Sequence, residues 1–177
     1  MLTKKANLFR VINNIYYKKD EPISLVHFIT NRCNARCSFC FIDFENSDSF
    51  KDELSLDEIN KLTKGLGKSL LNVNLTGGEP FARKDIIDVA KIYLKNTTVQ
   101  SLYITTNASL PDRIENFAKT INSIDRELDL NFQISIDDLP ENHDKVRKVE
   151  NLFDNCMDAY WRLKKINLKN VNPVISI

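Results

Sequence analysis

The sequence predicts an α/β protein in which about five parallel strands form one sheet and helices cover it. Two observations lead to this prediction. Short apolar segments of strand length alternate with longer segments whose apolar residues recur every three or four positions. Three predicted strands end near Thr76, Thr106 and Ile136, and this spacing of about 30 residues is the size of one strand–helix–strand unit. The pattern fits either a doubly wound sheet or an arc of a barrel, and both bind ligands at the carboxyl ends of their strands.

The first third of the chain is predicted to contain two helices with a strand between them. A short helix over about 7–17 has one apolar face, formed by Leu8, Ile12, Ile15 and Tyr16. A strand over 23–30 follows. Ser55 and Glu58 then form a capping box at the start of the next helix. A glycine in the left-handed conformation can end that helix, at either Gly65 or Gly67.

The remaining elements repeat the same alternation. Pro111 is placed well for the first turn of a helix, whose apolar stripe is Ile114, Phe117, Ala118 and Ile121. The last helix is predicted to be long, from about Glu141 to Lys165, and its apolar stripe includes Cys156. A further helix covers 85–94. The predicted strands cover residues 70–76, 99–105, 130–136 and 171–177.

Composition excludes several classes of protein. The chain has 177 residues, a net charge of +1 and 42% hydrophobic residues, which is ordinary for a globular domain. A near-neutral charge gives no electrostatic attraction to nucleic acid or to an anionic membrane. No apolar run approaches the ~20 residues of a membrane-spanning helix, and the first residues lack the apolar region of a signal peptide. We therefore expect a cytoplasmic protein that binds neither nucleic acid nor membranes.

Three of the four cysteines are clustered directly after the first predicted strand. Cys33, Cys37 and Cys40 have the spacing C-x3-C-x2-C, whereas Cys156 lies more than a hundred residues away. Three thiolates on one short loop can hold three irons of a [4Fe–4S] cluster and leave the fourth iron open. The alternatives are a zinc site and a chance group of core cysteines. Cys156 could supply a fourth zinc ligand, but its place on an apolar stripe favours a buried thiol.

Two further polar segments follow the next predicted strands. Gly77, Gly78 and Glu79 come after the strand over 70–76. Paired glycines let a ligand approach the backbone closely, and a carboxylate can accept a hydrogen bond from an ammonium group. The segment Thr105–Asn107 follows the strand over 99–105. Each segment also fits an ordinary turn or helix cap.

A fourth polar segment, from Ser135 to Arg147, begins at the end of the strand over 130–136. A guanidinium is a good bidentate partner for a carboxylate, so this segment can contribute to an anion site. His143 and Asp144 are better interpreted as a pair at a helix start that caps and positions the loop than as catalytic residues. His27 lies inside the first predicted strand, and we expect it to be a packed core histidine.

Together the four segments resemble the radical S-adenosylmethionine (SAM) superfamily. They occur in that family's order at successive strand ends, with the aromatic Phe39 before the third cysteine. The segment S-x-D…H-D-x-x-R is similar to a signature of the branch that includes many members with SPASM or twitch extensions. Ala108 and Asp138 stand where that pattern has glycine. The resemblance covers residues 24–177.

The resemblance implies a fold and two cofactors. The fold is a partial (β/α) TIM-like barrel of about five parallel strands with covering helices, open at its C-terminal end. The cofactors are a [4Fe–4S] cluster, ligated by Cys33, Cys37 and Cys40, and SAM, bound to the open iron. The implied domain is a single core over 1–177, incomplete because the family core usually has six strand–helix units.

The resemblance also implies the residues that contact SAM. Gly78 and Glu79 hold the methionine amino group, Ser135 and Arg147 hold its carboxylate, and Phe39 lines the adenine side. The full set of implied SAM-site residues is Phe39, Gly77, Gly78, Glu79, Asn107, Ser135, Asp137 and Arg147. No catalytic residue is assigned beyond these cofactor contacts.

The implied activity is that of an enzyme that reductively cleaves SAM to a 5′-deoxyadenosyl radical, which abstracts hydrogen from a peptide or a small molecule. The implied electron donor is a one-electron reductant such as a flavodoxin or ferredoxin. The length of the chain supports an alternative: a truncated, non-catalytic fragment that binds the cluster and SAM. Such a fragment needs its missing C-terminal part or a partner chain, which could pair with the exposed last strand.

Overall fold

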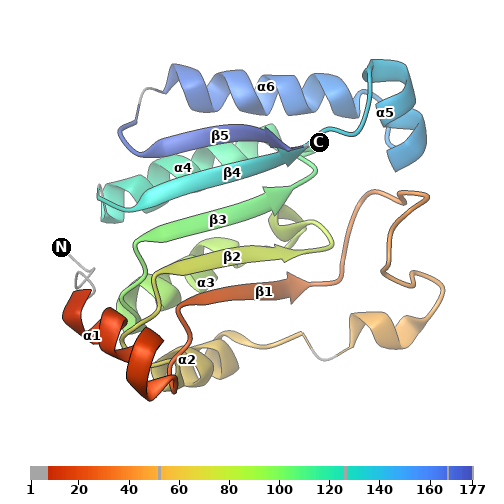
Figure 1. Cartoon of the computed structure of the whole chain (residues 1–177). Helices are drawn as coiled ribbons and strands as arrows, with labels where there is room; N and C mark the ends of the chain where they lie inside the picture. Colours follow the sequence, from red (N-terminus) through yellow and green to blue (C-terminus); the bar gives the residue numbers. More distant parts are fainter. Residues whose placement is uncertain (1–7, 52, 126, 167, 177) are drawn as a thin grey trace.

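The computed structural model describes residues 8–51, 53–125, 127–166 and 168–176. Within them, five parallel strands form one sheet in sequential order: β1 (Ser24–Thr30), β2 (Asn72–Gly77), β3 (Ser101–Thr106), β4 (Asp129–Ser135) and β5 (Val171–Ser176) (Figure 1). A doubly wound sheet reverses its strand order at a switch point, and this sheet does not. The fold is therefore an arc of a barrel, as the family resemblance implied. In the described part of the chain, β1 and β5 each pair with one neighbour only.

Helices cover one face of the sheet. The main ones are α2 (Leu56–Gly65), α3 (Ile86–Asn96), α4 (Pro111–Ile124) and α6 (Leu152–Lys165). Right-handed crossovers between sequential strands place all connecting helices on the same side. Accordingly, α2 packs against α3 and α4 packs against α6, and Figure 1 shows α3 and α4 behind the sheet. We call the opposite side of the sheet the helix-free face.

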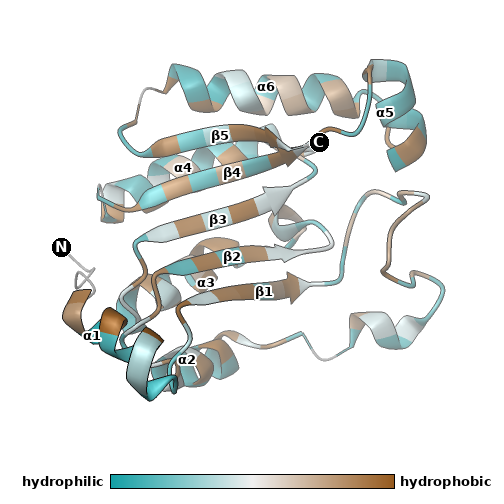
Figure 2. Cartoon of the chain, viewed as in Figure 1, coloured by the Kyte–Doolittle hydropathy of each residue, from teal (hydrophilic) through white to brown (hydrophobic). Residues whose placement is uncertain are grey.

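Side chains alternate between the two faces along each central strand. In β3, Leu102 and Ile104 are fully buried, whereas Tyr103 and Thr105 are partly exposed. Figure 2 shows the same alternation as brown bands that are separated by pale bands along β3 and by teal bands along β4. The core lies between the sheet and its helices, where Phe81, Phe117 and Phe132 form edge-on and stacked contacts. Period-two burial of this kind anchors the register of each strand.

Three local predictions are confirmed in the first part of the chain. The Ser55 hydroxyl accepts a hydrogen bond from the Glu58 N–H, and the Glu58 carboxylate accepts one from the Ser55 N–H, which is the capping box of α2. Gly67 adopts a left-handed φ of 78° just after the helix end. His27 is half-buried, and its Nδ1 lies 2.8 Å from the hydroxyl of Tyr93, so it is a packed histidine.

The predicted first helix differs from expectation in its buried side. It comprises α1 (Leu8–Asn13) and a π-helical turn, η1 (Asn14–Lys18), while residue 7 lies outside the described residues. Its expected apolar face is exposed, and Val11 is the buried apolar residue. The Asn14 amide donates to the Glu21 carbonyl and accepts from the Glu21 N–H. The helix is therefore held by Val11 and by the polar contacts of Asn14.

The prediction of one long helix from Glu141 to Lys165 is wrong. The chain instead forms α5 (Pro140–Arg147) and α6, separated by a turn in which Lys148 and Asn151 both have φ of 56°. In a continuous helix the last carbonyls of α5 would accept from N–H groups four residues later. Here the Val146 carbonyl accepts from Ser38 N–H at 3.1 Å, and the Arg147 carbonyl accepts from Arg36 N–H at 3.0 Å. The interruption of the helix thus attaches α5 to the loop that carries the cysteines.

No helix in the described ranges is both long enough and apolar enough to cross a membrane. This finding agrees with the sequence, in which no apolar run has the length of a membrane span.

Acidification is expected to destabilise the fold through His27. Burial lowers the pKa of His27 from 6.5 to about 4. Because the unfolded chain takes up this proton near pH 6.5 and the folded chain does so only near pH 4, stability falls as the pH is lowered through that window. We expect His27→Phe to flatten the pH dependence of the free energy of unfolding in this window, measured by urea denaturation. Tyr93→Phe keeps the imidazole, so its free energy of unfolding should depend on pH as that of the wild type does. If His27→Phe showed this same pH dependence, His27 would not be its cause.

Candidate functional site

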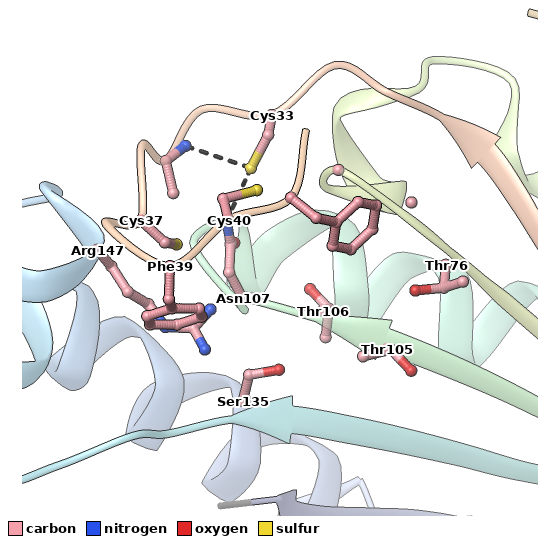
Figure 3. A pocket seen from close by; sticks show the side chains of 14 residues that line it. Cys33, Cys37, Phe39, Cys40, Thr76, Thr105, Thr106, Asn107, Ser135 and Arg147 are labelled. Atoms are coloured by element: carbon pink, nitrogen blue, oxygen red, sulfur yellow. Dashed lines mark hydrogen bonds between the residues drawn. The ribbon is translucent and has the colours of Figure 1, made fainter. Parts of the chain in front are cut away.

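The cysteine loop (residues 31–40) and the carboxyl ends of β2, β3 and β4 enclose a pocket of about 240 Å³ (Figure 3). Parallel strands bring their carboxyl ends to one edge of the sheet, so residues distant in sequence meet there. Nine of the eleven residues predicted for the cluster and SAM line this pocket: Cys33, Cys37, Phe39, Cys40, Gly77, Gly78, Asn107, Ser135 and Arg147. The other two, Glu79 and Asp137, lie behind the lining and hold parts of it.

The paired glycines are required by a close approach of two backbones. Gly77 has φ of 137°, and a Cβ there would lie 2.0 Å from the Thr30 carbonyl oxygen. A Cβ on Gly78 would lie 2.3 Å from the Arg32 carbonyl oxygen. The same carbonyls accept hydrogen bonds, Thr30 from the Gly78 N–H at 2.7 Å and Arg32 from the Glu79 N–H at 2.8 Å. These contacts hold the start of the cysteine loop against the end of β2.

Glu79 is placed differently from the expectation that its carboxylate faces the methionine amino group. Its side chain is fully buried and lies outside the pocket lining. The carboxylate accepts from Phe81 N–H at 3.0 Å, from the Thr106 hydroxyl at 2.7 Å and from Asn107 N–H at 2.7 Å. Burial raises the pKa of Glu79, while these three donors favour its charged form. Glu79 therefore organises the backbone around the pocket.

The three thiols of the cysteine loop face the pocket from one side, as Figure 3 shows. The Cys33 sulfur lies 3.4 Å from the Ala35 nitrogen and 3.7 Å from the Asn107 amide nitrogen, both of which donate to it. Burial raises the pKa of Cys33 and of Cys37. Metal binding must therefore displace protons from these thiols.

The donor set fits a cluster with three protein ligands. The described residues contain no group of three His, Cys, Asp or Glu side chains gathered for a single metal ion. A cubane cluster presents separate irons to its thiolates, so thiols spread around one pocket match it. Cys156 is buried outside the lining, and burial raises its pKa to about 12. The prediction that Cys156 belongs to the core is confirmed.

Arg147 brings a cation to the pocket beside the cysteine loop, where its carbonyl accepts from Arg36 N–H at 3.0 Å. Its Nε and Nη2 donate to the two carboxylate oxygens of Asp137 at 2.6 and 2.7 Å. This hydrogen-bonded pairing lowers the pKa of Asp137. The guanidinium carbon lies 5.9 Å from the centroid of the Phe39 ring, and Figure 3 shows Phe39 beside Arg147 with Ser135 nearby. Asp137 therefore orients the cation that lines the pocket.

The two departures from the family pattern have different consequences. Ala108 adopts a left-handed φ of 55°, so an alanine keeps the conformation that glycine would favour. Its N–H donates to the Thr106 hydroxyl at 2.9 Å. Asp138 does not have a positive φ, and its carboxylate accepts from Leu139 N–H at 2.7 Å.

Asp144, interpreted from the sequence as a helix-start residue, accepts from Phe153 N–H at 2.9 Å and so caps α6.

Sequence reasoning missed some of the lining. Five lining residues had not been assigned to the site: Ala35, Phe41, Thr76, Thr105 and Thr106. Phe41 directly follows the third cysteine, and its ring forms an edge-on contact with Phe28 of β1 at 5.9 Å between centroids. All five lie within or next to the polar segments that the sequence singled out, and this position was the available signal.

The helix-free face continues the pocket down the sheet and is mostly neutral and polar. The Thr105 hydroxyl lies 2.9 Å from Gln133 Oε1 and 3.2 Å from Asn74 Oδ1. One row further from the pocket, the Asn172 amide donates to Asn131 at 3.3 Å. On β1 the same face is apolar, since Val26 is 56% exposed and Phe28 is 51% exposed.

Charged groups are scarce on this face. Among the described strand residues that alternate onto it, the charged side chain is Asp129, at the amino end of β4 and far from the pocket along the strand. The face therefore offers hydrogen bonds on β2, β3 and β4 and apolar contact on β1.

Comparisons with known proteins agree with the fold and the site. The family model of the Radical SAM superfamily matches residues 28–177. A GTP 3′,8-cyclase of Clostridium perfringens is 30% identical over 151 residues, which are 83% of this chain and 45% of that enzyme. An Fe-coproporphyrin III synthase of Methanosarcina barkeri is 30% identical over 175 residues, which are 92% of this chain and 42% of that enzyme.

Solved structures show the same fold at lower identity. Native anSMEcpe with bound AdoMet superimposes with a TM-score of 0.65 at 16% identity, covering 87% of this chain and 44% of that one. Streptococcus suis SuiB bound to precursor peptide SuiA gives a TM-score of 0.64 at 18% identity, covering 94% and 36%. The chain thus spans less than half the length of these curated relatives and structures. With the family match over residues 28–177 and the cysteine triplet in the pocket, the chain belongs to the radical SAM superfamily.

Proposed function

We propose that this chain holds a [4Fe–4S] cluster and SAM and takes part in the reductive cleavage of SAM for hydrogen abstraction from a substrate. One observation carries the proposal: three cysteines, a pair of glycines and a buried arginine from three separate segments line one pocket. When bound, the reduced cluster supplies the electron that cleaves SAM to a 5′-deoxyadenosyl radical.

The residues of the pocket divide the work of binding. Cys33, Cys37 and Cys40 ligate three irons, which leaves the fourth iron for SAM. The backbone beside Gly78 receives the methionine amino group. This role falls to the backbone because the Glu79 carboxylate is buried outside the pocket lining, where three donors hold it. Phe39 lines the adenine side.

Arg147 and Ser135 bind the carboxylate of SAM in this proposal. Arginine has five N–H donors, and the pair with Asp137 engages its Nε and Nη2. The remaining donors of the guanidinium are available to a second carboxylate in the pocket. Asp137 orients the guanidinium before SAM binds, which reduces the entropy lost on binding.

A second candidate function follows from the share of its relatives that the chain covers. A segment that spans less than half of related enzymes can bind the cluster and SAM without completing the substrate site. A partner chain or a further segment would then pair with the open edge of β5. The test supplies the 177-residue chain with SAM and a reductant, either dithionite or a flavodoxin or ferredoxin as physiological donor. Release of 5′-deoxyadenosine supports the hypothesis that the chain is an enzyme. SAM binding without such release supports the hypothesis that it is a binding fragment.

For the substrate, we propose a molecule that presents uncharged hydrogen-bonding groups to the helix-free face. Asn74, Thr105 and Gln133 supply amide and hydroxyl groups there, and Phe28 supplies an apolar side. A peptide segment has this chemistry, and SuiB was solved with a precursor peptide. A nucleoside triphosphate, as the name of the cyclase relatives suggests, is the competing substrate.

The three cysteines of the loop are predicted to be the cluster ligands. After anaerobic reconstitution, we expect Cys33→Ala, Cys37→Ala and Cys40→Ala each to lose most of the bound iron and sulfide and the visible absorbance of the wild type. Cys156→Ser should keep its iron content, because this thiol lies outside the pocket lining. Zinc bound without sulfide, or iron loss in Cys156→Ser alone, would contradict the proposal.

Removal of the guanidinium is predicted to weaken SAM binding without removing the cluster. We expect Arg147→Lys to raise the Kd for SAM about tenfold, because an ammonium cannot form the bidentate contact. The measurement is a SAM titration of the dithionite-reduced cluster, followed by electron paramagnetic resonance. Lys119→Met changes an exposed cation on α4 and should bind SAM as the wild type does. Equal affinities in Arg147→Lys and the wild type would refute the assigned role.

The substrate proposal predicts which molecules stimulate SAM cleavage. Capped peptides rich in asparagine, glutamine and serine should increase 5′-deoxyadenosine formation more than GTP does. Asn74→Ala and Gln133→Ala should each reduce that stimulation several-fold, because each removes an amide group from the helix-free face. Stimulation by GTP alone, unaffected by either substitution, would favour the nucleotide substrate instead.

A further inference from the structure

His143 is buried on a helix that is otherwise largely exposed. It has no exposed surface, and Arg147 is the other buried residue of α5. Its ring forms an edge-on contact with Phe153 of α6, 6.0 Å between centroids. A buried imidazole retains two polar nitrogens, so its hydrogen-bond partners show what it does beyond packing.

Both nitrogens of His143 have partners in the site region. The Asp137 N–H donates to Nδ1 at 3.2 Å, so the ring proton of the neutral imidazole lies on Nε2. Burial lowers the pKa of His143, which keeps the ring neutral. Nε2 lies 3.9 Å from the sulfur of Cys156, within reach of a weak hydrogen bond to sulfur. The imidazole thus joins the backbone of Asp137 to Cys156.

Cys156 continues this chain of contacts toward the cysteine loop. Its thiol donates to the carbonyl oxygen of Asn107 at 3.2 Å. The side-chain amide of Asn107 donates in turn to the Cys33 sulfur at 3.7 Å and to the side-chain oxygen Oδ1 of Asn34 at 3.1 Å. One end of the chain of contacts is therefore the Asp137–Arg147 pair, and the other end is a cysteine of the pocket.

We infer that His143 is a positioning residue that, with Cys156, sets the position of Arg147 relative to Cys33. This inference rests on the proposed function, because it concerns how SAM fits the pocket that both residues line. His143 holds the backbone of Asp137, and Asp137 holds the guanidinium of Arg147 at 2.6 and 2.7 Å. A shift of the imidazole displaces the cation and the Asn107 backbone together.

The main test compares the only two histidines of the chain. His143→Phe preserves an aromatic ring against Phe153 and removes both polar contacts. After anaerobic reconstitution, we expect His143→Phe to bind as much iron as the wild type and its Kd for SAM to be about tenfold higher. The Kd is read from the electron paramagnetic resonance of the reduced cluster during a SAM titration. His143→Asn keeps an acceptor near the Nδ1 position and should recover part of the affinity. His27→Phe, the matched control, removes a histidine between β1 and α3 and should leave the Kd unchanged.

A second pair of variants keeps the inference falsifiable if His143→Phe fails to fold. Cys156→Ser retains a donor for the Asn107 carbonyl and should bind SAM nearly as the wild type does. Cys156→Ala lacks that donor and should bind SAM several-fold more weakly at equal iron content. Equal affinities of these two variants, or of His143→Phe and the wild type, would overturn the inference.

A measurement on metal-free protein is independent of the loaded enzyme. Long-range ¹⁵N–¹H correlation spectra at pH 7 should show His143 as the neutral tautomer protonated on Nε2. A ring protonated on Nδ1 would overturn the inference, since Nδ1 could not then accept from Asp137. If the wild type instead binds no cluster, or its cluster signal ignores SAM, the proposed function itself fails while the tautomer result stands.

Discussion

The buried carboxylate of Glu79 is the interaction on which the geometry of the pocket depends. A carboxylate without solvent is costly unless donors surround it, so its partners are held firmly in place. These partners come from Phe81 in the short helix η3 (Pro80–Ala82) and from Thr106 and Asn107 at the end of β3. Asn107 is thereby fixed with its side-chain amide directed at Cys33. A residue that the family resemblance assigns to the ligand thus shapes the pocket from behind.

The cysteine loop is held mainly through backbone hydrogen bonds. Its start is attached to the end of β2 where Gly78 and Glu79 donate to carbonyls of β1 and the loop. Its middle is attached to α5, whose final carbonyls accept from Arg36 and Ser38. Backbone bonds do not depend on the side chains between the cysteines, so the loop can present three thiols while its other side chains vary. The same bonds account for the interruption between α5 and α6.

Arg147 and Cys33 are also joined through the core. The Asp137–Arg147 pair lies at one end of this connection, and Cys33 lies at the other. His143, Cys156 and Asn107 connect them in a buried series of contacts. Burial strengthens such polar contacts, because water does not compete for the donors and acceptors. SAM, in the proposed function, binds in a pocket where the core has already set the position of Arg147 relative to Cys33.

The sequence by itself determined the number and order of the strands and most of the pocket lining. Strand ends in a parallel sheet meet at one edge, so the motifs at Cys33, Gly77 and Ser135 were predictable neighbours once the period-two and helical patterns were read. The capping box at Ser55 and the buried Cys156 were predictable because they depend on local spacing and hydrophobic register.

Tertiary structure alone decided which way individual side chains turn and where the last helical segment breaks. Glu79 turns inward because three donors from η3 and β3 surround it, and those donors lie up to 28 residues away in sequence. The helical pattern from Glu141 to Lys165 runs without interruption in the sequence, yet the carbonyls of Val146 and Arg147 bond to the cysteine loop. Helical periodicity reports which face of a segment is apolar, and it carries no information about a backbone partner more than a hundred residues earlier in the chain.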